Sequence, residues 1–534
     1  MKSHATMFSL RRTVQSEPIP GTVPNAAGGH AFAVSDWTRL DRFLVLGSDG
    51  GSYYAAPRAL TRDNAGAVQR CLAEDGLRAV AAIVAVSEGG RAPKQDPAIF
   101  ALALAAAAPD LATRRAALAA LPRVCRTGTH LFQFATAVEA MRGWGRGLRR
   151  AVGDWYLARP LDALAYQAVK YRSRQGWSHR DLLRLAHPET DEPARRALFD
   201  WICRGTLAEG LPAIVGAFAA VQAPGLDGAA AAALVRSHDL PWEALPTGLM
   251  TSRAVNEALI ERMPVGALVR QLGRLTAAGA LAPFSEGTER VRAVLSDRTH
   301  LLKARLHPMA LLLALKTYAS GRGQRGGLAW EPVASVVEAL NAAFYTAFRA
   351  VEPTGRRLVL ALDVSGSMAG SLVSGTGLSA REAAAAMALV TAATEEQWQI
   401  LGFTAEDGRP WSQGAALTAL PVAPSMRLDQ AVAATANLPF GPTDCSLPMR
   451  WALERGVRAD GFVVYTDSET WAGPVHPVQA LREYREKTGI PARLVVVGLV
   501  SNGFSIADPA DPGMLDVVGF DAAAPAVIAD FLRG

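Results

Sequence analysis

Two apolar runs in the last third of the chain each end in a carboxylate. Residues 358–362 (Leu-Val-Leu-Ala-Leu) precede Asp363, and residues 462–466 (Phe-Val-Val-Tyr-Thr) precede Asp467. Short apolar runs of this kind are typical of strands that are buried on both faces of a parallel sheet. The carboxyl ends of parallel strands meet at one edge, where open α/β folds place their binding crevices. We therefore expect a parallel sheet with both carboxylates on one edge.

Hydroxyl side chains accompany these two carboxylates. Asp363 opens the sequence Asp-Val-Ser-Gly-Ser, and Thr443 lies just before a helix-like segment. Mg²⁺ takes about six oxygens near 2.1 Å and keeps some of its waters, so hydroxyls can fill its inner shell while carboxylates hold the waters. The pattern is that of a metal-ion-dependent adhesion site. It predicts a divalent cation, Mg²⁺ or alternatively Mn²⁺, bound by Asp363, Ser365, Ser367, Thr443 and Asp467.

Two other interpretations of this motif are weaker. An isolated Asp-x-Ser-x-Ser sequence is more often an ordinary turn, but the placement of Thr443 and Asp467 favours the metal site. A phosphatase with Asp363 as its nucleophile would need a second carboxylate two residues on, where Ser365 stands. The sequence also lacks HExxH, Walker and GxSxG motifs. We therefore predict that the protein is not an enzyme.

Strand-like and helix-like segments alternate through this region. Ser379 and Glu382 form a capping box that opens an Ala-rich helix. We expect strands at residues 358–362, 399–404, 461–466 and 492–499, and helices at residues 379–394, 428–436, 446–455, 476–487 and 523–533. Alternation of this kind implies a doubly wound, Rossmann-like parallel sheet. The arrangement resembles a von Willebrand factor A domain, which we place at residues 356–534.

The first 355 residues have a different pattern. Segments one helix long, apolar at three-to-four spacing, are separated by short breakers, for example at residues 64–74, 77–87, 97–107, 111–125 and 129–142. Helical hairpins of this kind bury their apolar faces only against their neighbours and stack into solenoids with long curved surfaces. The overall prediction is an α-helical domain at residues 1–355 followed by an α/β domain.

Charge is divided unevenly between the two parts. Residues 351–534 contain 13 Lys and Arg against 20 Asp and Glu, whereas the preceding residues contain 42 against 29. A positive field attracts phosphate backbones, so nucleic acid is the first partner to consider. The alternative is that the many arginines are spread over solvated helix faces. Composition alone does not decide between them.

Several classes are disfavoured by composition. The longest apolar stretch, residues 98–108, is too short to cross a bilayer, and residues 1–12 lack the apolar core of a signal peptide. We therefore expect no membrane association and a cytoplasmic location. The four cysteines are scattered, so we predict neither a zinc site nor a disulfide framework.

One segment of the helical part, residues 170–187, is rich in cations and rings. Lys170 and Arg174 are four residues apart and would share a helix face, while Ser178 would cap a helix that carries Arg180. Guanidinium groups bind phosphates, and aromatic or imidazole rings stack on unpaired bases. The alternative is a solvated helix with Trp177 packed into the core.

Many phrases along the chain resemble the Ro autoantigen family, whose N-terminal region is called the TROVE module. They include residues 28–32, 42–48, 51–54, 143–147 and 170–187, and later 307–318, 362–368, 443–446 and 465–467. Two positions depart from the family pattern, since His30 stands where many relatives have Tyr and Ser468 where Asn is frequent. Arginine also replaces most of the lysine, which leaves the identity of the RNA open.

The resemblance implies a ring of HEAT-like helical repeats closed by the von Willebrand A domain. Small noncoding Y RNAs would lie on the basic outer surface, and single-stranded ends of misfolded RNAs would enter the central hole. Bacterial relatives are associated with exoribonucleases. Matching residue by residue, the resemblance assigns RNA contacts to Lys170, Arg172, Arg174, His179, Arg180 and His187, and the metal to the five residues named above.

We therefore predict a non-enzymatic, RNA-binding scaffold that supports RNA quality control, maturation or decay, and that is a monomer by default. The rival hypothesis is a protein-interaction scaffold that captures a partner's carboxylate on its metal, without RNA. A metal-assisted ribonuclease is the weakest hypothesis, because no general base stands beside the predicted metal ligands.

Overall fold

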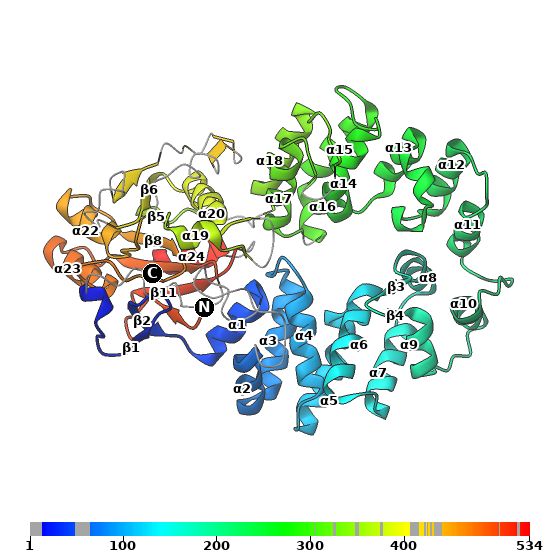
Figure 1. Cartoon of the computed structure of the whole chain (residues 1–534), viewed down its shortest axis with the longest axis horizontal. Helices are drawn as coiled ribbons and strands as arrows, with labels where there is room; N and C mark the ends of the chain where they lie inside the picture. The colour runs from blue at the N-terminus through cyan, green and yellow to red at the C-terminus, as the bar shows by residue number, and fades with distance from the viewer. Residues whose placement is uncertain are drawn as a thin grey trace, which may run out of the picture.

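The computed structural model describes residues 13–47, 65–304, 306–323, 327–347, 352–373, 378–405, 416–420, 423, 426–427, 430–431, 441–500, 502–520 and 524–534. Figure 1 shows a sheet domain from which helices depart, and to which they return, in a broad arc. The predicted combination of an α-helical part with an α/β domain is confirmed.

Six strands form the sheet in the order β11-β9-β8-β5-β6-β7. Neighbouring strands are parallel, except that β7 pairs antiparallel with β6. Every residue of β8 is buried, because the central strands are covered on both faces. The strands are β5 (Arg357–Asp363), β6 (Gln397–Phe403), β7 (Leu417–Ala419), β8 (Gly461–Thr466), β9 (Arg493–Gly498) and β11 (Met514–Val518).

Successive side chains of β5 enter two different cores, as strand geometry requires. Leu358, Leu360 and Leu362 join the core that contains α20 (Ala380–Thr394) and α24 (Ala524–Arg533). Val359 and Ala361 join the core that contains α22 (Leu447–Glu454) and α23 (Pro477–Thr488). Helices therefore cover both faces, as expected of a doubly wound sheet. A short helix, α19 (Gly366–Gly370), follows β5 directly.

The predicted elements of this domain agree closely with the observed ones. The capping box is present, with the backbone N–H of Ser379 donating to Glu382 Oε2 at 2.8 Å and the backbone N–H of Glu382 donating to Ser379 Oγ at 3.2 Å. The helix expected at residues 428–436 lies outside the described residues, apart from 430 and 431. Strands β7 and β11 were not predicted.

The helical part consists of stacked hairpins. α3 packs on α5, α5 on α7 and α7 on α9, while α4 packs against α6. The first helices are α1 (Asp36–Leu46), α2 (Gly66–Glu74), α3 (Gly76–Gly89), α4 (Asp96–Ala106), α5 (Leu111–Val124), α6 (Gly128–Arg142), α7 (Arg146–Leu157), α8 (Leu161–Lys170) and α9 (His179–Ala186). The five helices predicted in this stretch are therefore confirmed, each to within two residues.

The remaining helices complete the arc. They are α10 (Pro193–Arg204), α11 (Ala213–Val221), α12 (Gly228–His238), α13 (Arg253–Arg262), α14 (Val265–Ala277), α15 (Glu286–Ser296), α16 (Arg298–Lys303), α17 (Pro308–Ala319) and α18 (Ala334–Thr346). None of the described helices is long and apolar enough to cross a lipid bilayer.

The two ends of the arc meet beside the sheet domain. His307, which caps α17, donates from Nε2 to the backbone carbonyl of Arg91 at 3.0 Å. From the same helix, Lys316 pairs with Glu382 of α20 at 2.5 Å. The helices therefore form a ring-like arrangement that is closed against the sheet domain (Figure 1).

The first described residues pack on the sheet domain rather than on the helices. β1 (Thr22–Pro24) and β2 (His30–Ala33) form an antiparallel sheet with β10 (Phe504–Ser505). Gln15 donates from Nε2 to Asp444 Oδ1 at 2.6 Å, and Asn25 donates from Nδ2 to the carbonyl of Thr470 at 2.8 Å. A boundary at residue 355 places this N-terminal segment, residues 13–33, with the helices, whereas its contacts lie with the sheet domain.

Candidate functional site

The residues predicted to hold a cation lie together at the carboxyl edge of the sheet. Asp363 is the last residue of β5, and Asp467 follows β8 directly. The five side chains are nearly inaccessible to solvent, at no more than 2% exposure each: Asp363, Ser365, Ser367, Thr443 and Asp467. Polar groups that are so deeply buried require hydrogen-bond partners. The contacts of Asp363 and Asp467 show which of their oxygens have one.

Asp363 is held by its neighbours in the loop and the adjacent strand. The backbone N–H of Ser365 donates to Asp363 Oδ1 at 2.9 Å, and the Thr466 hydroxyl donates to Oδ2 at 2.7 Å. The hydroxyls of Ser365 and Ser367 lie 2.9 Å from each other. The motif therefore places a carboxylate and two hydroxyls at one point.

Thr443 is tied to the loop that carries Asp467. The backbone N–H groups of Trp471 and Ala472 donate to the carbonyl of Thr443 at 3.0 and 3.1 Å. The neighbouring carboxylate of Asp444 is satisfied by Gln15 and by the backbone N–H and hydroxyl of Ser446, at 2.6, 2.9 and 2.6 Å. Asp444 therefore holds the loop that carries Thr443.

Burial makes the charged form of both carboxylates unfavourable. Removal from water raises the pKa of Asp363. Burial, together with the negative charge of Asp363, raises the pKa of Asp467 to about 7. The guanidinium of Arg381 donates to the carbonyl of Ser365 at 3.1 Å and to that of Val364, and it offsets part of the charge of Asp363.

These residues fit a hard divalent cation. Asp467 Oδ2 is buried and has no hydrogen-bond partner in the part of the chain that the structure describes. The Asp467 carboxylate interacts with the charge of Asp363 and with the hydroxyl of Ser367. A Mg²⁺ or Mn²⁺ ion with its waters would satisfy the remaining oxygen. The donor set contains only oxygen, which does not favour zinc or copper.

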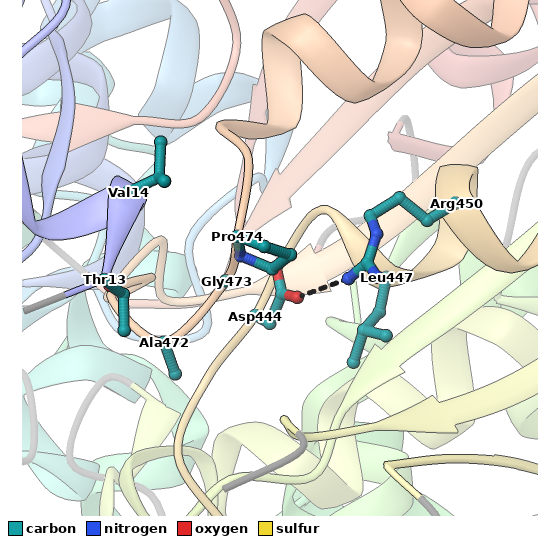
Figure 2. Close-up of a pocket in the computed structure, with 8 residues that line it drawn as sticks. All are labelled: Thr13, Val14, Asp444, Leu447, Arg450, Ala472, Gly473 and Pro474. Carbon is teal, nitrogen blue, oxygen red and sulfur yellow. Dashed lines mark hydrogen bonds and ion pairs between the residues drawn. The ribbon is translucent and has the colours of Figure 1, made fainter. Parts of the chain in front are cut away.

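A pocket of about 390 Å³ lies beside this site, where the N-terminal segment meets the sheet domain. Figure 2 shows Arg450 reaching across it to Asp444, with Nη1 and Oδ2 3.3 Å apart. The other lining residues are Thr13, Val14, Leu447, Ala472, Gly473 and Pro474. The pocket therefore lies at the contact between the N-terminal segment and the loop that follows Thr443.

The segment predicted to contact RNA contains a hairpin that the sequence analysis missed. α8 ends at Lys170, and β3 (Ser173–Arg174) pairs with β4 (Trp177–Ser178) through a turn. Gln175 and Gly176 have φ of 52° and 82°, as a type I′ hairpin turn requires. Lys170 and Arg174 therefore do not share a helix face, and that expectation was wrong.

The predicted cations of this segment differ in exposure. Arg172, Arg174, Arg180 and His187 are exposed. The Lys170 side chain is only 10% exposed, and its Nζ lies 3.8 Å from Glu243 Oε1. Burial lowers the pKa of Lys170, although the Glu243 carboxylate opposes this effect. Lys170 is therefore less available to a ligand than its arginine neighbours.

His179 lies in the core. It is 2% exposed, its Nδ1 is 2.8 Å from the hydroxyl of Tyr156, and its ring packs edge-on against Phe132 at a centroid distance of 4.8 Å. Burial lowers the pKa of His179 to about 4, so its ring is neutral at pH 7. The RNA contact expected of His179 conflicts with this buried position. The predicted cap is present, since the Ser178 hydroxyl accepts from the backbone N–H of Asp181 at 3.3 Å.

Neighbouring helices add cations that the sequence analysis did not select. Arg146, Arg149 and Arg150 are exposed on α7, which packs against α9 with its exposed Arg180 and Arg184. None of these five guanidinium groups has an ion-pair or hydrogen-bond partner among the described residues. For the three arginines of α7, the signal in the sequence is their spacing in Arg-Gly-Leu-Arg-Arg. This spacing puts them on the face of α7 opposite the buried Leu148. We call this set, with Arg172 and Arg174, the arginine surface.

Comparisons with known proteins match both parts of the chain. A model described as the Ro60 vWA domain matches residues 357–532, and one described as the TROVE domain matches residues 23–209 and 234–317. The chain is 44% identical to a protein of Deinococcus radiodurans called RNA-binding protein RO60, over 96% of this chain and 95% of that protein. It is 35% identical to the Caenorhabditis elegans protein of the same name, over 96% and 90%.

A solved structure agrees with the fold. The crystal structure of the Deinococcus radiodurans RO (RSR) protein superposes with a TM-score of 0.71 and 42% sequence identity, covering 94% of this chain and all of that one. The match therefore extends over almost the whole of both chains. On these matches, the chain belongs to the Ro60 family, with a TROVE domain and a Ro60 vWA domain.

Proposed function

We propose that this protein is a non-catalytic RNA-binding scaffold. The observation that carries the proposal is the arginine surface, on which seven exposed arginines of α7, α9 and the β3–β4 hairpin lack acidic partners among the described residues. Some exposed arginines elsewhere on the helical part do have a carboxylate partner, as Arg253 has in Glu257 at 2.7 Å. An unpaired set of guanidinium groups attracts phosphates and binds them in a bidentate manner.

The finer proposal follows the family resemblance. A small noncoding, Y-like RNA would bind across the arginine surface, and single-stranded ends of misfolded RNA would enter the ring. The protein would act as a cytoplasmic monomer in RNA quality control, maturation or decay, together with an exoribonuclease. The names of the relatives, which are called RNA-binding proteins, support RNA as the partner class.

We also propose a divalent cation, Mg²⁺ or Mn²⁺, in the sheet domain. The buried oxygen of Asp467 and the hydroxyls of Ser365 and Ser367 support it. When bound, the ion would supply a fixed positive charge with an open position. Asp363 and Asp467 would orient its waters, and the three hydroxyls would bind it directly.

The test of RNA binding compares two sets of substitutions with equal loss of charge. The triple variant Arg172→Ala, Arg174→Ala and Arg180→Ala removes unpaired arginines, and the control Arg204→Ala, Arg253→Ala and Arg292→Ala removes arginines that already have carboxylate partners. RNA that copurifies from cells is sequenced, and its affinity is titrated at several salt concentrations. We expect the first variant to lower the salt slope by about 2 to 3 and the control to leave it nearly unchanged.

Equal behaviour of the two variants would refute the arginine surface. No enrichment of any small RNA over bulk RNA, in the wild type itself, would refute RNA binding and favour the rival scaffold. The rival is supported by one observation, the buried carboxylates and hydroxyls at the edge of the sheet. A cation held there could in turn bind a partner's carboxylate. The rival scaffold predicts that the protein captures a partner protein in a way that EDTA abolishes and nuclease treatment does not affect.

A further inference from the structure

One arginine of the helical part is buried inside the sheet domain. Arg42, on α1, is 1% exposed. One branch of its guanidinium, Nη1, donates to the carbonyls of Asn502 and Phe504 at 2.8 and 2.9 Å, and the other branch, Nη2, pairs with Asp516 of β11 at 2.7 Å. A buried guanidinium with this many acceptors fixes the position of α1 against the sheet domain.

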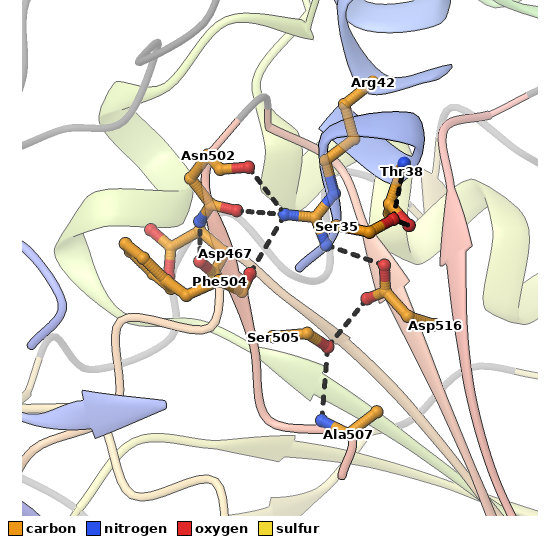
Figure 3. A network of polar contacts seen from close by, with 9 residues as sticks. All are labelled: Ser35, Thr38, Arg42, Asp467, Asn502, Phe504, Ser505, Ala507 and Asp516. Carbon is orange, nitrogen blue, oxygen red and sulfur yellow. Dashed lines mark hydrogen bonds and ion pairs between the residues drawn. The ribbon is translucent and has the colours of Figure 1, made fainter. Parts of the chain in front are cut away.

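The same contact reaches the cation site. The side chain of Asn502 accepts from Arg42 Nη1 at 2.5 Å and donates from Nδ2 to the backbone carbonyl of Asp467 at 2.5 Å. Figure 3 shows this chain of contacts from α1 through Asn502 to the loop after β8. The side-chain amide of Asn502 thus connects α1 to the backbone of Asp467, whose carboxylate is predicted to hold a cation.

The N-terminal segment holds the same loop from its other side. The carbonyl of Thr470 accepts from Asn25 Nδ2 at 2.8 Å, and the hydroxyl of Thr470 donates to Gln15 Oε1 at 2.5 Å. A Cβ on Gly29 would lie 1.9 Å from the carbonyl oxygen of Thr470, so the two backbones touch. The loop that carries Asp467 is therefore clamped between α1 and the N-terminal segment, both of which precede the sheet domain in sequence.

We propose that Asn502 and Arg42 are positioning residues for the cation site, and that cation binding and the docking of α1 on the sheet domain stabilise each other through them. The proposal rests on the cation site proposed above. Residues outside the sheet domain thus determine how well its loop presents Asp467. In return, a bound cation fixes the loop and strengthens the closure of the ring.

The physical reason is thermodynamic linkage. With α1 docked, the Asp467 peptide is fixed by Asn502, so less conformational freedom remains to be lost when a cation binds. With α1 undocked, Asn502 loses its partner, and the buried peptide group of Asp467 is left without a fixed donor. The factor by which docking of α1 raises the cation affinity must equal the factor by which the bound cation raises the docking equilibrium constant.

The experiment measures hydrogen exchange of the full-length protein with saturating MnCl₂ and with EDTA. In the wild type, we expect Mn²⁺ to slow exchange in residues 363–368 and also in α1, which contains none of the five predicted ligands. In Asn502→Ala, saturating Mn²⁺ should still protect residues 363–368 but no longer protect α1. A Mn²⁺ titration of the same exchange should show roughly fivefold weaker affinity than in the wild type. The control Asp516→Asn weakens docking through the other branch of Arg42, so α1 should remain sensitive to Mn²⁺.

The outcomes separate the two proposals. Mn²⁺ protection of residues 363–368 without any effect on α1 in the wild type would overturn the linkage and leave the cation site standing. No protection anywhere in the wild type would overturn the cation site, and the linkage with it. If Asn502→Ala does not fold, the wild-type comparison still decides. A Mn²⁺ effect on α1 that is the same size in Asn502→Ala as in the wild type would exclude Asn502 as the positioning residue.

Discussion

Lowering the pH should loosen the helical part around His179, because its imidazole is buried in neutral form. Burial lowers the pKa of His179 to about 4, against 6.5 for an exposed histidine. The unfolded chain therefore binds a proton at a higher pH than the folded chain does. The stabilisation from neutral His179 is complete above about pH 6.5, falls as the pH drops below that value, and stops falling near pH 4.

The size of the effect follows from these two pKa values. The full difference between the two pKa values corresponds to about 3 kcal/mol. At pH 5, where the unfolded histidine is mostly charged and the folded one still neutral, the loss is about 2 kcal/mol relative to high pH. Burial also lowers the pKa of His130, on α6, to about 4. The two histidines together should cost the helical part about 4 kcal/mol at pH 5.

The assay is hydrogen exchange of peptides from α7 to α9, corrected for the intrinsic effect of pH, in the wild type and in His179→Gln. A glutamine side chain is an acceptor for the Tyr156 hydroxyl but does not titrate. We expect His179→Gln to be less stable than the wild type at pH 7, because it loses the ring packing, and to show about 2 kcal/mol less pH dependence between pH 7 and 5. Its affinity for copurified RNA at pH 7 should match that of the wild type.

Two results would contradict this reasoning. An unchanged pH dependence in His179→Gln would mean that His179 is not the titrating group. A selective loss of RNA affinity in a variant that is folded at pH 7 would restore the surface role that the family resemblance assigned to His179, against its position in the core.

Three further predictions concern single side chains. Gly128→Ala should destabilise the same region by about 1 to 3 kcal/mol, seen as a lower denaturation midpoint, because its Cβ would lie 2.7 Å from His179 Nε2. Ser178→Ala should cost about 1 kcal/mol through loss of the α9 capping box, and Ser178→Asp should restore most of it. Asp363→Ala should abolish Mg²⁺ uptake in calorimetry while leaving RNA affinity nearly unchanged; normal uptake would exclude Asp363 as a ligand.

The sequence predicted the sheet domain well because its strands and helix caps are encoded by residues close together in the chain. An apolar run that ends in a carboxylate identifies a buried strand and its functional end together, as at Asp363 and Asp467. The capping box at Ser379 and the helical spacing of the first hairpins depend on residues three or four apart. Strand β11 was not predicted because Asp516 interrupts its apolar run. The Asp516 carboxylate forms an ion pair with Arg42, which is distant in sequence.

The basic segment shows where a pattern is ambiguous. Lys170 and Arg174 have helical spacing, but the turn residues Gln175 and Gly176 form a hairpin between them and α9. Gly after a polar residue is a known hairpin signal, but the helical spacing of the cations around it favours a helix. His179 and His187 look alike in sequence, yet one fills the core and the other is exposed. Only packing distinguishes them.

Contacts between distant parts of the chain lie beyond any local pattern, and Arg42 is the clearest case. Nothing in its neighbours in sequence, Phe43 to Leu46, indicates a buried charge. The structure instead buries that arginine on acceptors 460 to 474 residues away. A charge costs several kcal/mol to bury unless its partners are preformed, so α1 can dock only on a sheet domain whose Asn502 loop and β11 are already in place. The ring should therefore close after the sheet domain folds, even though α1 is synthesised first.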